Sequence, residues 1–268
     1  MTTASIRHSF TRRFLWAGYL IGFALGGFFD GILLHQILQW HHLLSGLEQA
    51  GDLRAQVLAD GLFHGLMYVI AAAGLWMLYR SRQEFTGARA DRNLIADVLI
   101  GFGVWHIVDT LFSHWLTGIH RIRMDVPDPL PWDIAWLVLF GLLPFIVGLL
   151  MKRRYPRNAT LADRRTRRHG LALSVGTLTL VAGAWATLPP AGTQATNTVT
   201  VVLRPDVRPG EFLAALNGSN ARILWSDRVG GVWVLTAADS DALRYYRYGA
   251  MYVSGSVLPA GCSAWIKT

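Results

Sequence analysis

The sequence predicts an all-α polytopic membrane bundle, with a four-helix core and one tether helix, followed by a C-terminal α+β domain of the ferredoxin-like (βαββαβ) type. Three observations carry this prediction. The 268-residue chain is 52% hydrophobic and only 16% charged, with a mean hydropathy of +0.32, which is too apolar for an ordinary soluble domain. Five long apolar runs end before residue 190. Beyond residue 197 the pattern changes to short β-branched runs separated by turn residues.

Each apolar run is long enough to cross a hydrocarbon layer of about 30 Å, which takes roughly 17–25 helical residues. The first four runs join through short or moderate loops, and they carry glycines that let membrane helices approach closely. An arginine-rich stretch, residues 152–168, sets the fifth run apart as a tether. The predicted spans are residues 14–39, 61–79, 94–117, 134–151 and 170–188.

The basic residues indicate the orientation of these spans. Fifteen Lys and Arg residues precede the first span, follow the second, or separate the fourth from the fifth, whereas the opposite loops hold only Arg54, Arg121 and Arg123. By the positive-inside rule, the N-terminus lies in the cytoplasm and the C-terminal domain lies outside the inner (plasma) membrane. The net charge of +8 is therefore a topology signal, and membrane lipid rather than nucleic acid is the expected partner.

The chain is expected to divide into a membrane domain (1–155), a basic cytoplasmic loop with the fifth helix (156–190) and an extracytoplasmic domain (197–268). In the last part, the pattern predicts strands at 198–203, 222–226, 232–235 and 251–257, and helices at 209–216 and 239–248, the second capped by Asp239. This order is that of a ferredoxin-like sandwich. Cys262 is the only cysteine, so a single chain cannot build a disulfide or a thiolate metal site.

Seven of the nine histidines, with three aspartates, fall near the outer ends of the first three spans. In the third span, His106, Asp109, Ser113, Thr117 and His120 form one stripe of an α-helix. In the second, His64 follows Asp60 by four residues, one turn along the same face. An intramembrane aspartate costs about 2.5–3.5 kcal/mol on insertion scales, so these groups are expected to have a compensating role.

A metal ion is the economical explanation, because imidazole and carboxylate groups are the usual donors for zinc, copper and iron. Copper is the preferred cofactor, with zinc, iron and haem as alternatives. The predicted metal set is His35, Asp60, His64, His106, Asp109 and His114. A supporting set is Asp30, His41, His42 and His120. Among these, His64 and His106 have the strongest sequence case, while His114 lies about a quarter turn off the stripe.

Other interpretations remain open at this level. Asp30 could serve as polar glue between helices, and His41 and His42 could be solvated loop histidines. Two histidines on facing helices, His64 with His106 or His114, could ligate a haem in a membrane electron carrier. A third possibility is a non-catalytic accessory subunit whose outer domain docks a membrane metalloenzyme or oxidase complex. The sequence leaves open whether the protein is an enzyme.

One long segment of the chain, residues 27–42, together with the motifs around residues 60–64 and 101–120, resembles a family of bacterial predicted membrane proteins, domain-of-unknown-function family 2243. The resemblance covers roughly residues 14–151. It implies that the shared His and Asp positions of the family fall on the ten residues of the two sets above. Members tend to accompany cytochrome oxidase assembly factors, which points toward copper or respiratory biogenesis. The fifth span and the outer domain extend the short family form.

Overall fold

The structure is a computed structural model that describes residues 10–38, 40–47, 53–85, 88–154, 170–187, 198–217, 219–236 and 242–253. The proposed helix cap at Asp239 and the single cysteine, Cys262, lie outside these residues. The chain forms two compact units. The first contains Met1–Asp30 and His64–Gly183, and the second contains Gly31–Phe63 and Ala184–Thr268.

Four helical segments are long and apolar enough to cross a membrane: Arg12–His35, Arg54–Arg80, Ala90–Leu116 and Leu130–Arg153. They correspond to the first four predicted spans, and each begins or ends within a few residues of the expected position. The fifth predicted span forms α6, Gly170–Thr187, whose apolar part is shorter than the other four. The chain is therefore a mostly helical membrane protein with four candidate membrane-spanning helices.

Three of the four spans contain a π-helical segment, in which the hydrogen bonds run from residue i to i+5. The first span is α1, Arg12–Asp30, continued by η1, Gly31–Ile37. The third is α3, Ala88–Asp109, continued by η4, Thr110–Leu116. The fourth contains α4, Leu130–Trp136, η5, Leu137–Leu142, and α5, Leu143–Arg154. In η5 the widening comes just before Pro144, which has no amide hydrogen to donate to the preceding turn. The second span, α2, Leu53–Arg80, is α-helical throughout.

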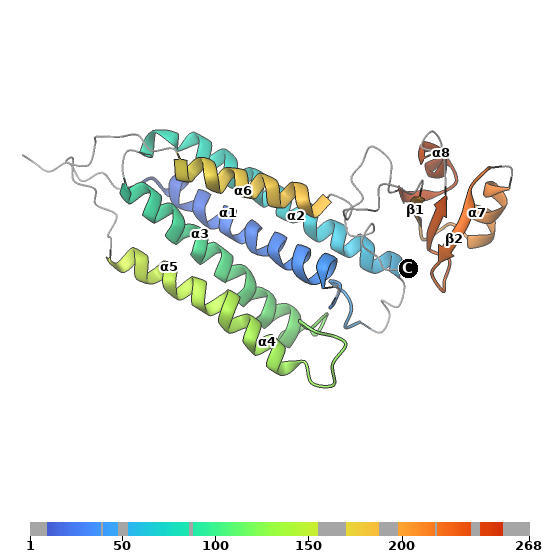
Figure 1. The fold of residues 1–268 in the computed structure, drawn as a ribbon, viewed down its shortest axis with the longest axis horizontal. Helices are drawn as coiled ribbons and strands as arrows, with labels where there is room; N and C mark the ends of the chain where they lie inside the picture. Colours follow the sequence, from blue (N-terminus) through green and yellow to red (C-terminus); the bar gives the residue numbers. More distant parts are fainter. Residues whose placement is uncertain are drawn as a thin grey trace, which may run out of the picture. The chain divides into compact units, whose positions relative to one another are not determined.

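In the first unit, α1 lies beside α3, and α5 lies on the far side of α3 (Figure 1). Glycines allow this close approach. A Cβ at Gly101 would overlap the carbonyl of Tyr19, and one at Gly103 would lie 2.6 Å from the carbonyl oxygen of Gly141. The N-terminal ends of α1 and α3 are held by an apolar cluster around Phe14, Phe85 and Leu94, against which α6 also packs. Small residues thus set the helix positions on which the polar groups depend.

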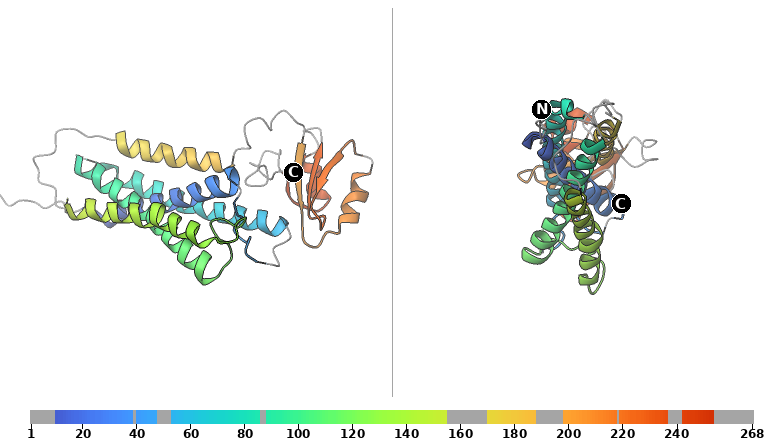
Figure 2. Two further views of the ribbon diagram at one scale, coloured as in Figure 1. Left: turned by 60° about the horizontal axis from the view of Figure 1, so that its bottom comes forward. Right: turned by 90° about the vertical axis from the view of Figure 1, so that its left-hand side faces the viewer.

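The C-terminal part of the chain contains a four-stranded antiparallel sheet in the order β2-β3-β1-β4. Its strands are β1 (Thr198–Leu203), β2 (Arg222–Ser226), β3 (Val232–Thr236) and β4 (Ala250–Val253). Two helices, α7 (Pro209–Leu216) and α8 (Ala242–Arg247), lie beside the sheet (Figure 2). They share one core with it through Phe212, Leu216 and Tyr245. The predicted alternation of strands and helices is confirmed, with boundaries shifted by at most a few residues.

Candidate metal centre

The histidines and aspartates of the membrane spans gather in two clusters. The Asp109 cluster contains Asp109, His114, His120, Arg121 and Asp133 and lies in the first unit. The Asp60 cluster contains His35, His41, His42 and Asp60 and lies in the second.

The backbone around the Asp109 cluster departs from α-helical geometry, and this brings its side chains together. Asp109 is the last residue of α3, and His114 follows it by five residues within η4. Five residues make about one π-helical turn, so the two side chains stack on one face. Gly118 then adopts a φ of +66°, a left-handed conformation that suits glycine. The turn returns the chain so that His120 meets His114, with ring centroids 4.8 Å apart.

Three side chains of this cluster converge on one point. His114 Nε2 lies 3.0 Å from Asp109 Oδ2, and His120 Nε2 lies 3.5 Å from Asp109 Oδ1. One donor atom from each of the three residues lies within 4.8 Å of the other two, and all three residues are buried. Two imidazoles and a carboxylate at this separation match the ligand set of a divalent transition metal.

Asp133 lies behind His114, on the first helical turn of the fourth span. Its Oδ1 is 3.1 Å from His114 Nδ1. It also accepts hydrogen bonds from the backbone N–H of Ile122 at 3.0 Å, from Arg121 Nη1 at 2.6 Å and from Trp115 Nε1 at 3.3 Å. A carboxylate so fixed holds the tautomer of His114 that presents Nε2 to a metal.

The two ring nitrogens of His114 face more carboxylate oxygens than a neutral imidazole can donate to, so a proton or metal ion is needed between them. Both of its ring nitrogens lie within about 3 Å of a carboxylate oxygen, yet a neutral imidazole has only one N–H to donate. The side chains of His114 and Asp133 are fully buried and that of Asp109 is 3% exposed. Burying a carboxylate requires a compensating partner. A proton or a metal ion between His114 Nε2 and Asp109 fills this requirement.

The Asp60 cluster is built around a carboxylate with the same kinds of partner. Asp60 Oδ1 lies 3.3 Å from His35 Nδ1 and accepts the backbone N–H of Leu43 at 2.8 Å, while Oδ2 lies 2.7 Å from His42 Nδ1. The ring of His41 lies 4.7 Å from that of His35, centroid to centroid. His35, His41 and Asp60 are buried. The sequence named these four residues, and the structure brings them together.

Three further sequence candidates are buried within the spans. Asp30 is buried at the end of α1, and His64 is buried within α2. The Nδ1 of His106 lies 2.9 Å from the carbonyl oxygen of Phe102 in its own helix, and its ring lies among those of Phe29, Trp136 and Phe140. Its buried Nε2 has no hydrogen-bond partner among the described residues. His106 therefore belongs to an aromatic surrounding outside both clusters.

Asp133 is a residue of the candidate site that the sequence analysis does not name. The polar positions singled out from the sequence belong to the first three spans, whereas Asp133 begins the fourth after a proline-rich loop. An acidic residue next to an apolar span was a sufficient signal. His114 lies about a quarter turn off the stripe only in α-helical geometry. The π-helical segment η4 has wider turns and brings His114 to the same face as Asp109.

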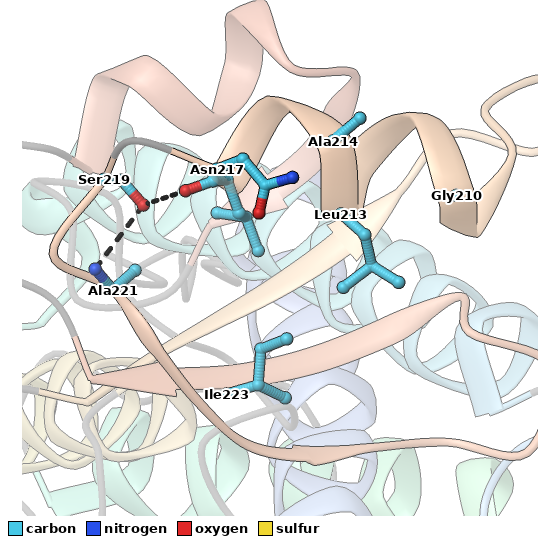
Figure 3. Close-up of a pocket in the computed structure, with 8 residues that line it drawn as sticks. Gly210, Leu213, Ala214, Asn217, Ser219, Ala221 and Ile223 are labelled. Carbon is cyan, nitrogen blue, oxygen red and sulfur yellow. Dashed lines mark hydrogen bonds between the residues drawn. The ribbon is translucent and has the colours of Figure 1, made fainter.

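The C-terminal part carries a groove of different chemistry. It lies between α7 and the edge strand β2, with a volume of about 500 Å³, and its described lining residues include none that is titratable. Figure 3 shows Leu213 and Ile223 facing each other across it, with Ser219 hydrogen-bonded to the turn at its end. Such a lining offers neither acid, base nor metal ligand. The two clusters of the membrane spans are thus the candidate sites.

Comparisons with curated proteins and with solved structures gave no match. The family described as "Predicted membrane protein (DUF2243)" matches residues 17–155. This segment contains both clusters, including the Asp133 carboxylate, and ends before α6 and the C-terminal sheet. The matched region spans more than half of the chain and agrees with the four apolar helices, so the chain belongs to this family of predicted membrane proteins.

Proposed function

We propose that this protein is an integral membrane metal-binding protein, with copper as the preferred ion, that stores or delivers the ion for a respiratory or other membrane metalloenzyme. One observation carries the proposal: Asp109, His114 and His120 converge within 4.8 Å, with Asp133 behind His114. Membrane helices that only pack together have no need to present three donors to a common point, or to orient one of them by a carboxylate.

The donor chemistry favours Cu(II) or zinc over Cu(I). The cluster offers nitrogen and oxygen atoms, whereas Cu(I) prefers the sulfur of cysteine and methionine. The chain has one cysteine and six scattered methionines. At equal ligand sets Cu(II) binds more tightly than zinc in the general order of divalent metal affinities, which supports copper.

In this proposal the four spans form a polytopic bundle in the inner membrane with a cytoplasmic N-terminus. The basic loops support this orientation, which puts both clusters near the outer surface. The C-terminal domain, with its ferredoxin-like order of strands and helices, then lies outside and docks the receiving metalloenzyme complex. The groove between α7 and β2, whose described lining residues include none that is titratable, supports a docking role better than a catalytic one.

Metal analysis of the full chain in detergent tests the proposal. The purified protein is loaded with Cu(II) or Zn(II), freed of excess metal and measured by mass spectrometry, as wild type and as His114→Ala, His120→Ala and His106→Ala. The first two variants should lose metal, whereas His106→Ala, which removes an equally buried histidine outside the clusters, should not. Equal, substoichiometric metal in all four proteins would refute it. An absorption spectrum of the same samples tests the haem alternative, which requires a strong Soret band.

A further inference from the structure

The first and third spans share a sequence pattern at a constant separation of 79 residues. The segments 15–23 and 94–102 both read Leu-x-Ala-x-x-Leu-Ile-Gly-Phe. Farther along, the spacing Asp-x4-His-x5-His occurs twice, with its members at Asp30, His35 and His41 and at Asp109, His114 and His120. A match in both the packing residues and the polar residues, at one offset, indicates that the two spans are copies of one unit.

The π-helical segments of the first and third spans are separated by the same 79 residues. Each π-helical segment is seven residues long and starts directly after the aspartate of the motif, η1 after Asp30 and η4 after Asp109. The two histidine pairs have nearly the same geometry. The rings of His35 and His41 lie 4.7 Å apart at 73°, and those of His114 and His120 lie 4.8 Å apart at 70°.

The helices that follow the two motifs supply equivalent carboxylates. Asp60 in the second span and Asp133 in the fourth each face the Nδ1 of the motif histidine, at 3.3 and 3.1 Å. Each also accepts the backbone N–H of the residue two positions after the second histidine, Leu43 at 2.8 Å and Ile122 at 3.0 Å. The residue that separates the second histidine from this N–H, His42 in one cluster and Arg121 in the other, binds the other carboxylate oxygen. The contacts around the two carboxylates are thus repeated in kind.

Packing contacts between the spans are reciprocal, as copies require. Gly22 lies against the carbonyl of Val98, and the corresponding Gly101 lies against the carbonyl of Tyr19, which corresponds to Val98. The second and fourth spans show the same relation. A Cβ at Gly74 would lie 2.8 Å from Ile21 Cγ1, and one at Gly148 would lie 2.7 Å from Ile100 Cγ1.

These reciprocal contacts define a pseudo-two-fold axis. Gly18 meets Asp97 and Gly26 meets Trp105, and in each pair the two residues are 79 positions apart. Equivalent residues can touch at several levels of parallel helices only if the axis runs between α1 and α3 along their length. Parallel repeats about an axis along the membrane normal are an established architecture of membrane proteins.

We infer that the membrane domain is an internal duplication and that each half holds one divalent metal ion, so that the chain carries two equivalent sites. Asp109, His114 and His120 form the second site. His35 and His41 form the first, with Asp60 orienting His35 through Nδ1 as Asp133 orients His114, and with Asp30 in the sequence position of Asp109. The nature of the ligand rests on the proposed function; the duplication rests on the repeated contacts alone.

Counting ions per chain tests this inference. Full-length protein in detergent is loaded with Cu(II), and bound copper is measured by mass spectrometry and by quantitative electron paramagnetic resonance. We expect two ions in the wild type, one in His35→Ala, one in His114→Ala, and none in the double variant. The two single variants should each retain a different one of the two wild-type resonance signals.

Two results would overturn the inference while leaving the proposed function intact. The first is a wild-type protein with one copper ion per chain that His35→Ala retains. The second is a wild-type protein with one copper ion per chain that both His35→Ala and His114→Ala lose, which indicates one shared site. Absence of any bound metal in the wild type would reject the proposed function as well. Should an alanine variant fail to fold, His35→Gln and His114→Gln remove the ligand nitrogen while keeping bulk, with size-exclusion profiles as the folding check.

Discussion

In the Asp60 cluster the carboxylate of Asp60 binds His42. In the Asp109 cluster the corresponding carboxylate, Asp133, binds Arg121 instead. Each carboxylate also contacts a motif histidine and accepts one backbone N–H, so the replacement of His42 by Arg121 changes the charge beside an otherwise similar carboxylate. Arginine is always protonated, but histidine can be neutral. A divalent ion near Arg121 experiences a repulsion that is absent near a neutral His42. The difference teaches that duplicated sites with equal ligands need not have equal affinities, and we expect the Asp60 cluster to bind metal more tightly.

The largest effect is expected from the interface between α1 and α3. In Gly22→Ala the added methyl overlaps the carbonyl of Val98, and overpacking of this kind costs about 1–3 kcal/mol or more. We expect a clear fall in the melting temperature in detergent and loss of metal from both clusters together. Gly65→Ala is the matched control, because a Cβ there meets nothing within 4 Å. An unchanged melting temperature in Gly22→Ala would contradict this prediction.

The second largest effect is expected from the carboxylates of Asp60 and Asp133. Asp133→Asn removes the acceptor that orients His114, and Asp60→Asn does the same for His35. Each variant should weaken its own site by about 10–100-fold, the usual range for a carboxylate behind a metal-ligating histidine, and leave the other site unchanged. Competition titrations with a Cu(II) chelator measure both affinities. An equal effect of either variant on both sites would count against two independent centres.

A smaller effect is expected from exchanging the residues that differ. Arg121→His should raise the affinity of the Asp109 cluster by roughly tenfold, about 1.4 kcal/mol, since it removes a charge beside the carboxylate. His42→Arg should lower the affinity of the Asp60 cluster by a similar factor. The same chelator titration measures both. If the Asp60 cluster still binds copper more tightly after Arg121→His and His42→Arg, the charge at this position does not determine which cluster has the higher affinity.

The smallest effect is expected at Arg123, which pairs with Asp125 on the loop after the Asp109 cluster. The Asp125 side chain is 60% exposed, and pairs in contact with water contribute little to stability. Arg123→Ala should therefore change neither the melting temperature nor the copper content measurably. A loss of copper in this variant would mean that the electrostatic influence on the site extends beyond Arg121.

Much of the fold followed from the sequence because its signals are local. Apolar length marked the four spans, and turn residues such as Gly230 and Gly231 separated strands that the structure places within a few residues of the prediction. Each element could be recognised from its own residues. The lengths of the π-helical segments could not, since a hydrophobic pattern does not reveal where one turn widens.

The candidate site can be predicted only in part from the sequence, because α-helical spacing does not hold in the π-helical segments. His64 and His106 ranked first because they fit an α-helical stripe, yet the structure gathers donors around His114, which did not fit. Whether His64 or His106 binds metal stays a prediction. The internal repeat is not visible when each span is considered alone. Alignment of the first span with the third reveals the shared Leu-Ile-Gly-Phe segment from the amino-acid sequence by itself.

The reciprocal glycine contacts between α1 and α3 also have an evolutionary reading. An interface in which each partner offers the same surface to the other is isologous, the kind that closes a homodimer. A chain with a single copy of the unit would carry everything needed to pair with itself in this way. Fusion of two such copies would preserve the dimer while freeing each to change separately, and Arg121 opposite His42 is the kind of divergence that this freedom permits.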